Sequence, residues 1–212
     1  MKVMLVNGSP HKNGCTHAAL MEAAKELNNE GIDTEVFWIG INPISGCTAC
    51  MGCESTGRCF IDDGVNEFRK LAAEADGFLF GTPVYYASAN GSMISFMDRV
   101  FFSEHRGNDG KAFYMKPAAA VISARRAGTT FTFDQINKYF TISQMPVVSA
   151  QYWNMVHGMA PDEVRKDVEG MYTMRVLGRN MAYILKCLEA GSKAGLPLPK
   201  GETPAKMNFI RD

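Results

Sequence analysis

Residues 2–16, KVMLVNGSPHKNGCT, indicate the fold of this chain more directly than any other stretch. Lys2 to Val6 is a short apolar run of strand-forming residues, and Asn7 and Gly8 end it with a turn. Residues 16–29 then repeat apolar side chains at helical spacing. The stretch therefore predicts a strand, a loop and a helix, the first unit of an α/β fold.

The same alternation continues along the chain. Strands that alternate with helices and carry continuous apolar runs form a parallel sheet with both faces covered. The sequence therefore predicts a doubly wound α/β sandwich with a five-stranded parallel sheet. The expected strands cover residues 2–6, 34–40, 77–83, 118–123 and 146–149, and the expected helices cover residues 16–29, 66–75, 89–101, 131–140 and 161–187, the last as one long amphipathic helix.

The composition is typical of one folded domain: 46% of the residues are hydrophobic and 21% are charged. We expect a single domain over residues 1–195, with a cysteine-rich insertion at 45–61 after the second strand. Residues 196–212 contain three prolines and are expected to form an arm.

The charge balance argues against a nucleic-acid partner, because 22 Lys and Arg residues match 22 Asp and Glu residues. No apolar run is long enough to predict a signal peptide or a membrane span. The expectation is a cytoplasmic protein without a membrane partner.

The loop NGSPHKNGCT, residues 7–16, is a candidate phosphate site. Its glycines allow close backbone approach, Ser9 and Thr16 supply hydroxyls, and a helix begins directly behind it. The loop matches neither a Walker loop nor a GxGxxG fingerprint, so a single phosphate such as that of FMN fits better than a nucleoside triphosphate. A turn that caps a helix and binds nothing is the alternative.

Two more loops are expected at the same edge of the sheet. Residues 81–90 end the third strand with Tyr85 and Tyr86, which would pack against a flat ring. Residues 123–130 end the fourth strand with Arg125, Arg126 and a glycine, which would stabilise negative charge on a reduced flavin. Without a ligand, the tyrosines would pack against the protein and the arginines would be solvated or salt-bridged.

Together, NGSPHKNGCT, GTPVYYASANGSMISFMDR and SARRAGTT resemble the NADPH-dependent FMN reductase family of flavodoxin-like proteins, and the cysteine run resembles its iron–sulfur flavoprotein branch. The likeness covers about residues 1–157. The sequence departs from the family pattern at His11, where Arg is usual, and at Cys15, where Asn or Ser is usual. The resemblance implies an FMN site formed by Ser9, His11, Asn13, Gly14, Cys15 and Thr16 at the phosphate, Pro83, Val84, Tyr85 and Tyr86 at the ring, and Ser123, Arg126 and Gly128 at its other edge.

Four of the six cysteines, Cys47, Cys50, Cys53 and Cys59, follow the pattern CxxCxxCx5C. This spacing lets one short loop provide all ligands of a [4Fe–4S] cluster. Zinc is an alternative because four thiolates suit it equally, although zinc sites usually separate two CxxC pairs by a dozen or more residues. Free or redox-active thiols are the third interpretation. The resemblance favours the cluster.

Three residues outside these motifs also have expected places. Cys187 falls on the apolar side of the last helix and is expected to be an inert core thiol. Asp62 and Asp63 are expected to cap the helix after the cysteine segment.

The function that these features predict is an FMN-dependent oxidoreductase that moves electrons between FMN and a [4Fe–4S] cluster. The donor would be NAD(P)H or a protein such as ferredoxin. The resemblance also implies a homo-oligomer, a dimer or a tetramer, in which the cluster of one chain faces the flavin of its neighbour. The alternatives are a cluster-free NAD(P)H:FMN or quinone reductase and a flavodoxin-like electron carrier that is not an enzyme.

Overall fold

A computed structural model of the chain describes residues 1–202, so the part of the expected arm at 203–212 lies outside the described residues. Five parallel strands pair in the order β2-β1-β3-β5-β6, and the two-residue β4 pairs antiparallel with the end of β3. The strands are β1 (Lys2–Asn7), β2 (Asp33–Trp38), β3 (Gly77–Tyr85), β4 (Ser88–Ala89), β5 (Ala118–Ala124) and β6 (Met155–His157), and the helices are α1 (Cys15–Asn29), α2 (Gly52–Thr56), α3 (Gly64–Glu74), α4 (Gly91–Asn108), α5 (Thr129–Ile142), α6 (Pro161–Val164) and α7 (Val168–Lys193).

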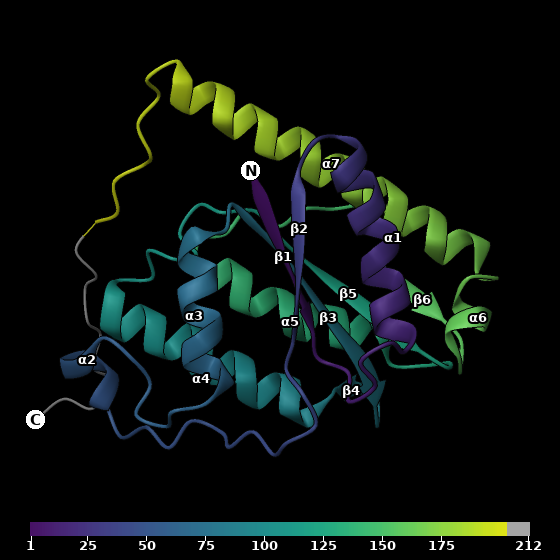
Figure 1. Ribbon diagram of the computed structural model, residues 1–212, viewed down its shortest axis with the longest axis horizontal. Coiled ribbons are helices and arrows are strands. Elements are labelled where there is room, and N and C mark those ends of the chain that lie inside the picture. Colours follow the sequence, from purple (N-terminus) through teal and green to yellow (C-terminus); the bar gives the residue numbers. More distant parts are fainter. Residues whose placement is uncertain (203–212) are drawn as a thin grey trace, which may run out of the picture.

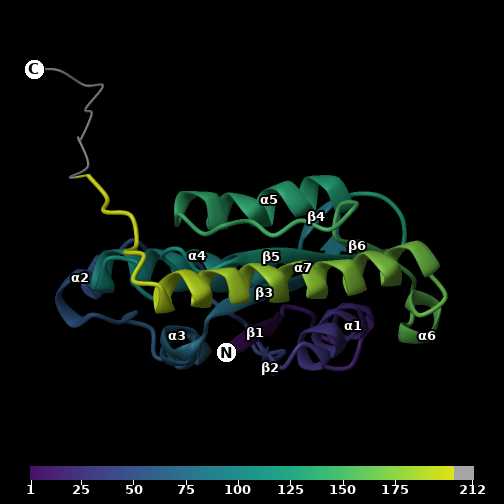
Figure 2. The same cartoon turned by 90° about the horizontal axis from the view of Figure 1, so that it is seen from above.

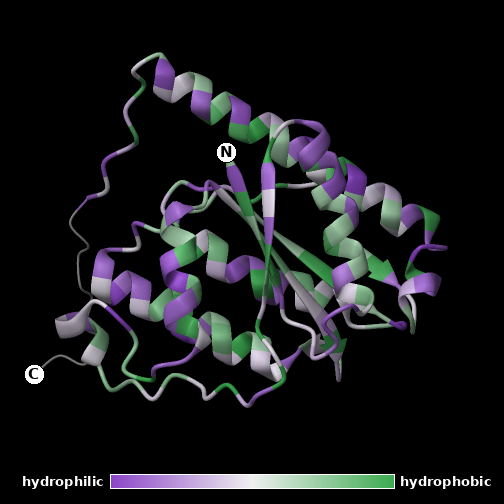
Figure 3. Ribbon diagram, viewed as in Figure 1, coloured by the Kyte–Doolittle hydropathy of each residue, from purple (hydrophilic) through white to green (hydrophobic). Residues whose placement is uncertain are grey.

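The helices cover both faces of the sheet, which confirms the predicted doubly wound sandwich (Figure 1). Side chains of α1 and α7 pack on one face, and those of α3, α4 and α5 pack on the other. Seen from above, α1 and α5 lie on opposite sides of the strands (Figure 2). Every long helix carries both hydrophobic and hydrophilic residues, as expected of helices with one buried side (Figure 3).

The strand order reverses between β1 and β3, which places a topological switch point at the carboxyl ends of these two strands. Ligands of open α/β sheets bind in the crevice outside such a point. The loop after β1 therefore lies where the sequence predicts a site.

The last predicted strand is in the wrong place. Residues 146–149 are apolar and strand-forming, but only Val147 makes a bridge, to Ala118. The chain then leaves the sheet and returns as β6, which pairs with Ile122–Ala124. The edge position is filled by two short pieces of chain, residues 146–148 beside the start of β5 and β6 beside its end.

The predicted helix over residues 161–187 is also wrong, because α6 and α7 are separate helices. Asp167 caps α7 by accepting a hydrogen bond from the Gly170 N–H, 2.9 Å from its Oδ1. Val164 in α6 and Met171 in α7 are both buried on the same side of the sheet. Apolar residues therefore keep their helical spacing across the break between α6 and α7, so periodicity alone does not reveal the break.

Three further expectations have different outcomes. Cys187 is exposed, so the prediction of a core thiol is wrong. Asp63 caps α3, as predicted, by accepting from the Val65 N–H at 3.1 Å, whereas Asp62 instead accepts from the Asn66 side chain at 3.3 Å and pairs with Arg58. Residues 196–202 form no helix or strand, and the Pro199 carbonyl accepts a hydrogen bond of 2.6 Å from the Tyr114 hydroxyl. Within the described residues, no helix combines the length and the apolar character needed to cross a bilayer.

Candidate functional site

Three loops meet at the carboxyl ends of β1, β3 and β5. The Gly8 N–H donates to the Gly81 carbonyl at 2.8 Å, which joins the first loop to β3. The Thr16 and Ser123 hydroxyls, both buried, are hydrogen-bonded at 2.8 Å and join α1 to the end of β5. We call this assembly, residues 7–16, 81–90 and 123–130, the rim.

The first loop of the rim is held in one conformation by its own polar groups. The buried Asn7 side chain accepts from the Ser9 N–H at 3.1 Å and donates to the Lys12 carbonyl at 2.9 Å. The Ser9 hydroxyl accepts from the His11 N–H at 3.1 Å, and the Ser9 carbonyl accepts from the Trp38 indole at 2.8 Å. The loop is therefore organised before any ligand binds.

The N-terminus of α1 opens into this loop without a side chain that caps it. Gly14 is the N-cap residue, and the first turn contains no acidic side chain. The free N–H groups and the helix dipole make the local potential positive. Burial lowers the pKa of His17, and the charges of Arg165 and Lys12 lower it further. The loop is suited to an anion such as a phosphate.

The second loop is a tight hairpin between β3 and β4. Its two central residues, Tyr86 and Ala87, have φ angles of 50° and 58°, a left-handed conformation that is costly for residues with a side chain. Tyr86 is fully exposed and Tyr85 is 45% exposed, so neither tyrosine packs into the protein as the ligand-free alternative required. Both rings are available to a ligand.

The third loop contacts the second through Gly128, whose φ angle is +97°. A Cβ atom on Gly128 would lie 2.5 Å from the Ala87 Cα and 2.9 Å from a Val84 methyl group. Only a glycine lets the two loops approach this closely. The structure thus brings the predicted Thr16, Ser123, Val84 and Gly128 together at one edge of the sheet.

The other predicted residues differ in exposure, and one of them, Cys15, makes its side-chain contact outside the three loops of the rim. The Cys15 thiol contacts the Gly158 carbonyl at 3.6 Å, after the end of β6, and burial raises its pKa. Neither Gly158 nor Trp38 is among the site residues that the sequence predicts. Of the thirteen predicted rim residues, Ser9, Gly14, Cys15, Thr16, Pro83, Val84, Ser123 and Gly128 are buried or half-buried, and His11, Asn13, Tyr85, Tyr86 and Arg126 are exposed.

The cysteine segment lies beside α4, and all four cysteines line one small pocket. Cys53 is buried, Cys59 is half-buried, and Cys47 and Cys50 are exposed. Burial raises the pKa of Cys53, and the three other cysteines are close enough to raise it further. Within residues 1–202, no three His, Cys, Asp or Glu side chains are gathered closely enough to hold a single metal ion.

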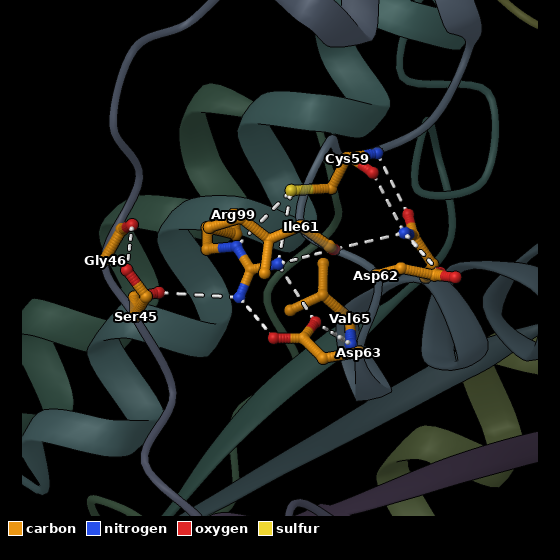
Figure 4. Close-up of polar contacts among 9 residues, drawn as sticks. Ser45, Gly46, Cys59, Ile61, Asp62, Asp63, Val65 and Arg99 are labelled. Atoms are coloured by element: carbon orange, nitrogen blue, oxygen red, sulfur yellow. Dashed lines mark hydrogen bonds and ion pairs between the residues drawn. The ribbon is translucent and has the colours of Figure 1, made fainter.

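Two residues from helices hold Cys59, and the sequence did not predict either. The Asn66 side chain of α3 accepts from the Cys59 N–H at 2.9 Å and donates to the Cys59 carbonyl at 3.0 Å. The Arg99 guanidinium of α4 donates to the Cys59 sulfur at 3.3 and 3.4 Å (Figure 4). Burial lowers the pKa of Arg99, but hydrogen bonds to Asp63 and Cys59 outweigh it and leave the pKa raised. The guanidinium therefore stays charged.

The rim and the cysteine pocket lie at different positions along α4. This helix begins at Gly91, just after the second loop of the rim, and Arg99 lies about 12 Å further along its axis at the usual helical rise. Cys53 contacts the helix still further on, where a Cβ on Gly107 would lie 2.9 Å from the Cys53 carbonyl oxygen. The two predicted sites are separate within one chain.

Comparison with known proteins agrees with this architecture. The chain matches the NADPH-dependent FMN reductase family over residues 1–160. It is 32% identical over 199 residues to an iron–sulfur flavoprotein of Methanocaldococcus jannaschii, with 89% of this chain and 100% of the relative covered. An iron–sulfur flavoprotein of Methanosarcina thermophila is 26% identical over 192 residues, with 89% and 97% covered.

Solved structures also share the fold. RosB with the bound intermediate 8-demethyl-8-formylriboflavin-5'-phosphate superimposes with a TM-score of 0.70 at 15% identity, with 100% of this chain and 92% of RosB covered. A flavodoxin from the domain Archaea superimposes with a TM-score of 0.57 at 17% identity, with 88% and 99% covered.

Proposed function

Because the chain belongs to the NADPH-dependent FMN reductase family, in its iron–sulfur flavoprotein branch, we propose that this oxidoreductase moves electrons between FMN at the rim and a [4Fe–4S] cluster at the four cysteines. The observation that carries the proposal is the convergence of three loops on the switch point, joined by the Thr16–Ser123 hydrogen bond.

The rim residues fit a ring that carries one phosphate. The positive N-terminus of α1 and the Ser9 loop would bind the phosphate. The exposed rings of Tyr85 and Tyr86 would pack against the isoalloxazine, and Arg126 would face its other edge. Bound FMN would supply hydride acceptance and electron transfer. The protein contributes the placement of the ring and the electrostatics around it.

The residues that line the cysteine pocket include four thiols, the donor type that an iron–sulfur cluster requires. Four thiols from one segment line a single pocket, and the Cys59 sulfur already receives two N–H groups from Arg99. Sulfur ligands of this kind suit iron–sulfur clusters and zinc alike, so metal analysis distinguishes the two.

We propose a homo-oligomer, a dimer or a tetramer, because the cysteine pocket lies along α4 away from the rim of the same chain. A second copy would bring a cysteine pocket close to a rim. The proposed donor is NAD(P)H or a protein such as ferredoxin. A cytoplasmic location is part of the proposal, since thiolate sites persist in reducing compartments.

The test is the absorption spectrum and the metal content of protein purified under anaerobic conditions. Flavin bands together with a broad iron–sulfur absorption that dithionite bleaches, and with iron in the metal analysis, are the expected result. Zinc without iron would overturn the cluster, and a colourless protein that stays colourless with excess FMN would overturn the flavin site.

Turnover assays then separate the proposed enzyme from its rivals. NAD(P)H oxidation with a quinone or free flavin by iron-free protein would identify a cluster-free reductase. Reduction by ferredoxin alone, with no turnover of NAD(P)H, would identify an electron carrier.

A further inference from the structure

Arg99 places a positive charge against one of the four cysteine sulfurs. Its side chain is 0% exposed and lies between Cys59 and Asp63 (Figure 4). Nε and Nη2 donate to the Cys59 Sγ at 3.4 and 3.3 Å. Nη1 and Nη2 donate to the two carboxylate oxygens of Asp63 at 2.6 and 2.9 Å. The guanidinium is thus shared between a carboxylate and a sulfur.

The remaining contacts leave the guanidinium no freedom to turn away. The Ile61 carbonyl oxygen lies 2.9 Å from Nη2, whose two hydrogens are therefore shared among three acceptors, and Nη1 lies 3.5 Å from the Ser45 carbonyl. The backbone of Cys59 is fixed as well, because Asn66 binds both its N–H and its carbonyl. A buried guanidinium whose N–H groups all have acceptors is rigid and preorganised.

Two charge-assisted donors are more than a neutral thiol requires, since a thiol is a weak acceptor. They suit a sulfur that carries negative charge, as a ligand to iron does. Hydrogen bonds to the ligand sulfurs and the net charge of the surroundings set the reduction potential of an iron–sulfur cluster. One-electron reduction adds one negative charge and changes no bond, so a fixed cation stabilises the reduced state more than the oxidised state.

We propose that Arg99 is a positioning residue that fixes the Cys59 sulfur and raises the reduction potential of the cluster. The inference rests on the cluster in the proposed function. It adds a residue from α4, 40 positions beyond Cys59 in the sequence, to the cysteine site.

The test uses R99M, R99K and the control R106M in anaerobically prepared, cluster-loaded protein. Arg106 also lies on α4, and it pairs with Glu54 of the cysteine segment at 3.2 Å, so R106M removes a nearby charge without removing an N–H to sulfur. R99M is expected to fold, because it leaves Asp63 with a 33% exposed side chain rather than a buried charge. R99K keeps the positive charge but lacks the planar arrangement of N–H donors. Thermal unfolding of each variant shows whether it is folded.

The midpoint potential of the cluster is measured by dye-mediated titration, with the FMN potential as an internal reference. R99M is expected to shift the cluster potential to more negative values, R99K to shift it less, and R106M to leave it near the wild-type value, with the FMN potential unchanged in all three. Release of iron to a chelator is expected to be several-fold faster in R99M.

Equal potentials in R99M and R106M, with a cluster present in both, would overturn the role of Arg99 and leave the proposed function standing. Wild-type protein that contains zinc or no metal would overturn the cluster and this inference together.

Discussion

Gly128 is the residue on which the contact between the second and third loops of the rim depends. Its φ angle of +97° and the short distance to Ala87 leave no room for a side chain. The sequence predicted this glycine as part of the flavin site, but only as one of several. The packing shows why the position requires glycine.

Replacing Gly128 with alanine is expected to separate the two loops and to weaken FMN binding by about tenfold or more, equivalent to about 1.4 kcal/mol. Titration of the apoprotein with FMN, followed by flavin fluorescence, measures the change.

G110A is the matched control, because Gly110 has a φ angle of +70° but a methyl group added there would meet no atom within 4 Å. It carries the same backbone strain of about 1–2 kcal/mol without a clash. Equal FMN affinities in the two variants would argue against the rim as the flavin site.

The β3–β4 hairpin combines backbone strain with two exposed tyrosines. Left-handed residues other than glycine cluster at functional sites, where the surroundings maintain the strain. Tyr86 and Ala87 are such a pair, and no packing of the Tyr86 ring explains it. The proposed flavin provides a reason.

We expect Y86G to relieve the strain and to raise the free energy of unfolding by up to about 1 kcal/mol while it weakens FMN binding. Denaturant unfolding and FMN titration of the same samples measure the two effects. Q144G is the control, since Gln144 is an exposed residue with a φ angle of 56° away from the rim. It is expected to gain stability and to keep its FMN affinity. Unchanged FMN affinity in Y86G would show that the Tyr86 ring is not part of the FMN site.

The start of α7 depends on Asp167, which also holds the end of β6. Its Oδ2 accepts from the His157 N–H at 2.7 Å, while its Oδ1 caps the helix. We expect D167A to lower the free energy of unfolding by about 1–2 kcal/mol, as loss of a helix cap does. Chemical denaturation measures this change.

D162A provides the comparison, because Asp162 belongs to an exposed ion pair with Arg165 in and beside α6. Its effect is expected to stay within about 0.5 kcal/mol. If D162A costs as much as D167A, the cap does not define the beginning of α7.

The hydrophobic core and the cysteine segment occupy different parts of the molecule. Two hydrophobic clusters, one on each face of the sheet, contain the buried strands and the helices that cover them. Of the four cysteines, only Cys59 packs against one of these clusters. The cysteine site therefore contributes little to the stability of the sheet.

We expect C50S to abolish iron binding in anaerobic reconstitution while far-UV circular dichroism and FMN affinity remain at wild-type values. C187S is the control, because Cys187 is also exposed but lies on α7, outside the cysteine segment. It should retain both cofactors. Loss of FMN binding in C50S would show that the two sites depend on each other within the chain.

Local sequence patterns were sufficient to predict the α/β class, the candidate flavin-binding loops and the cysteine segment. Apolar runs predict strands, glycines and hydroxyls predict a loop before a helix, and the spacing of Cys47 to Cys59 predicts one compact set of metal ligands. Each of these patterns lies within about fifteen consecutive residues.

The position of the edge strand, the break between α6 and α7, and the partners of Cys59 became visible only in the folded chain. Arg99 and Asn66 are ordinary helix residues in the sequence, and Ser123 lies 107 positions from Thr16. Contacts of this kind arise when the sheet brings distant strand ends and helices together. No local periodicity encodes them, because each depends on the packing of two separate segments.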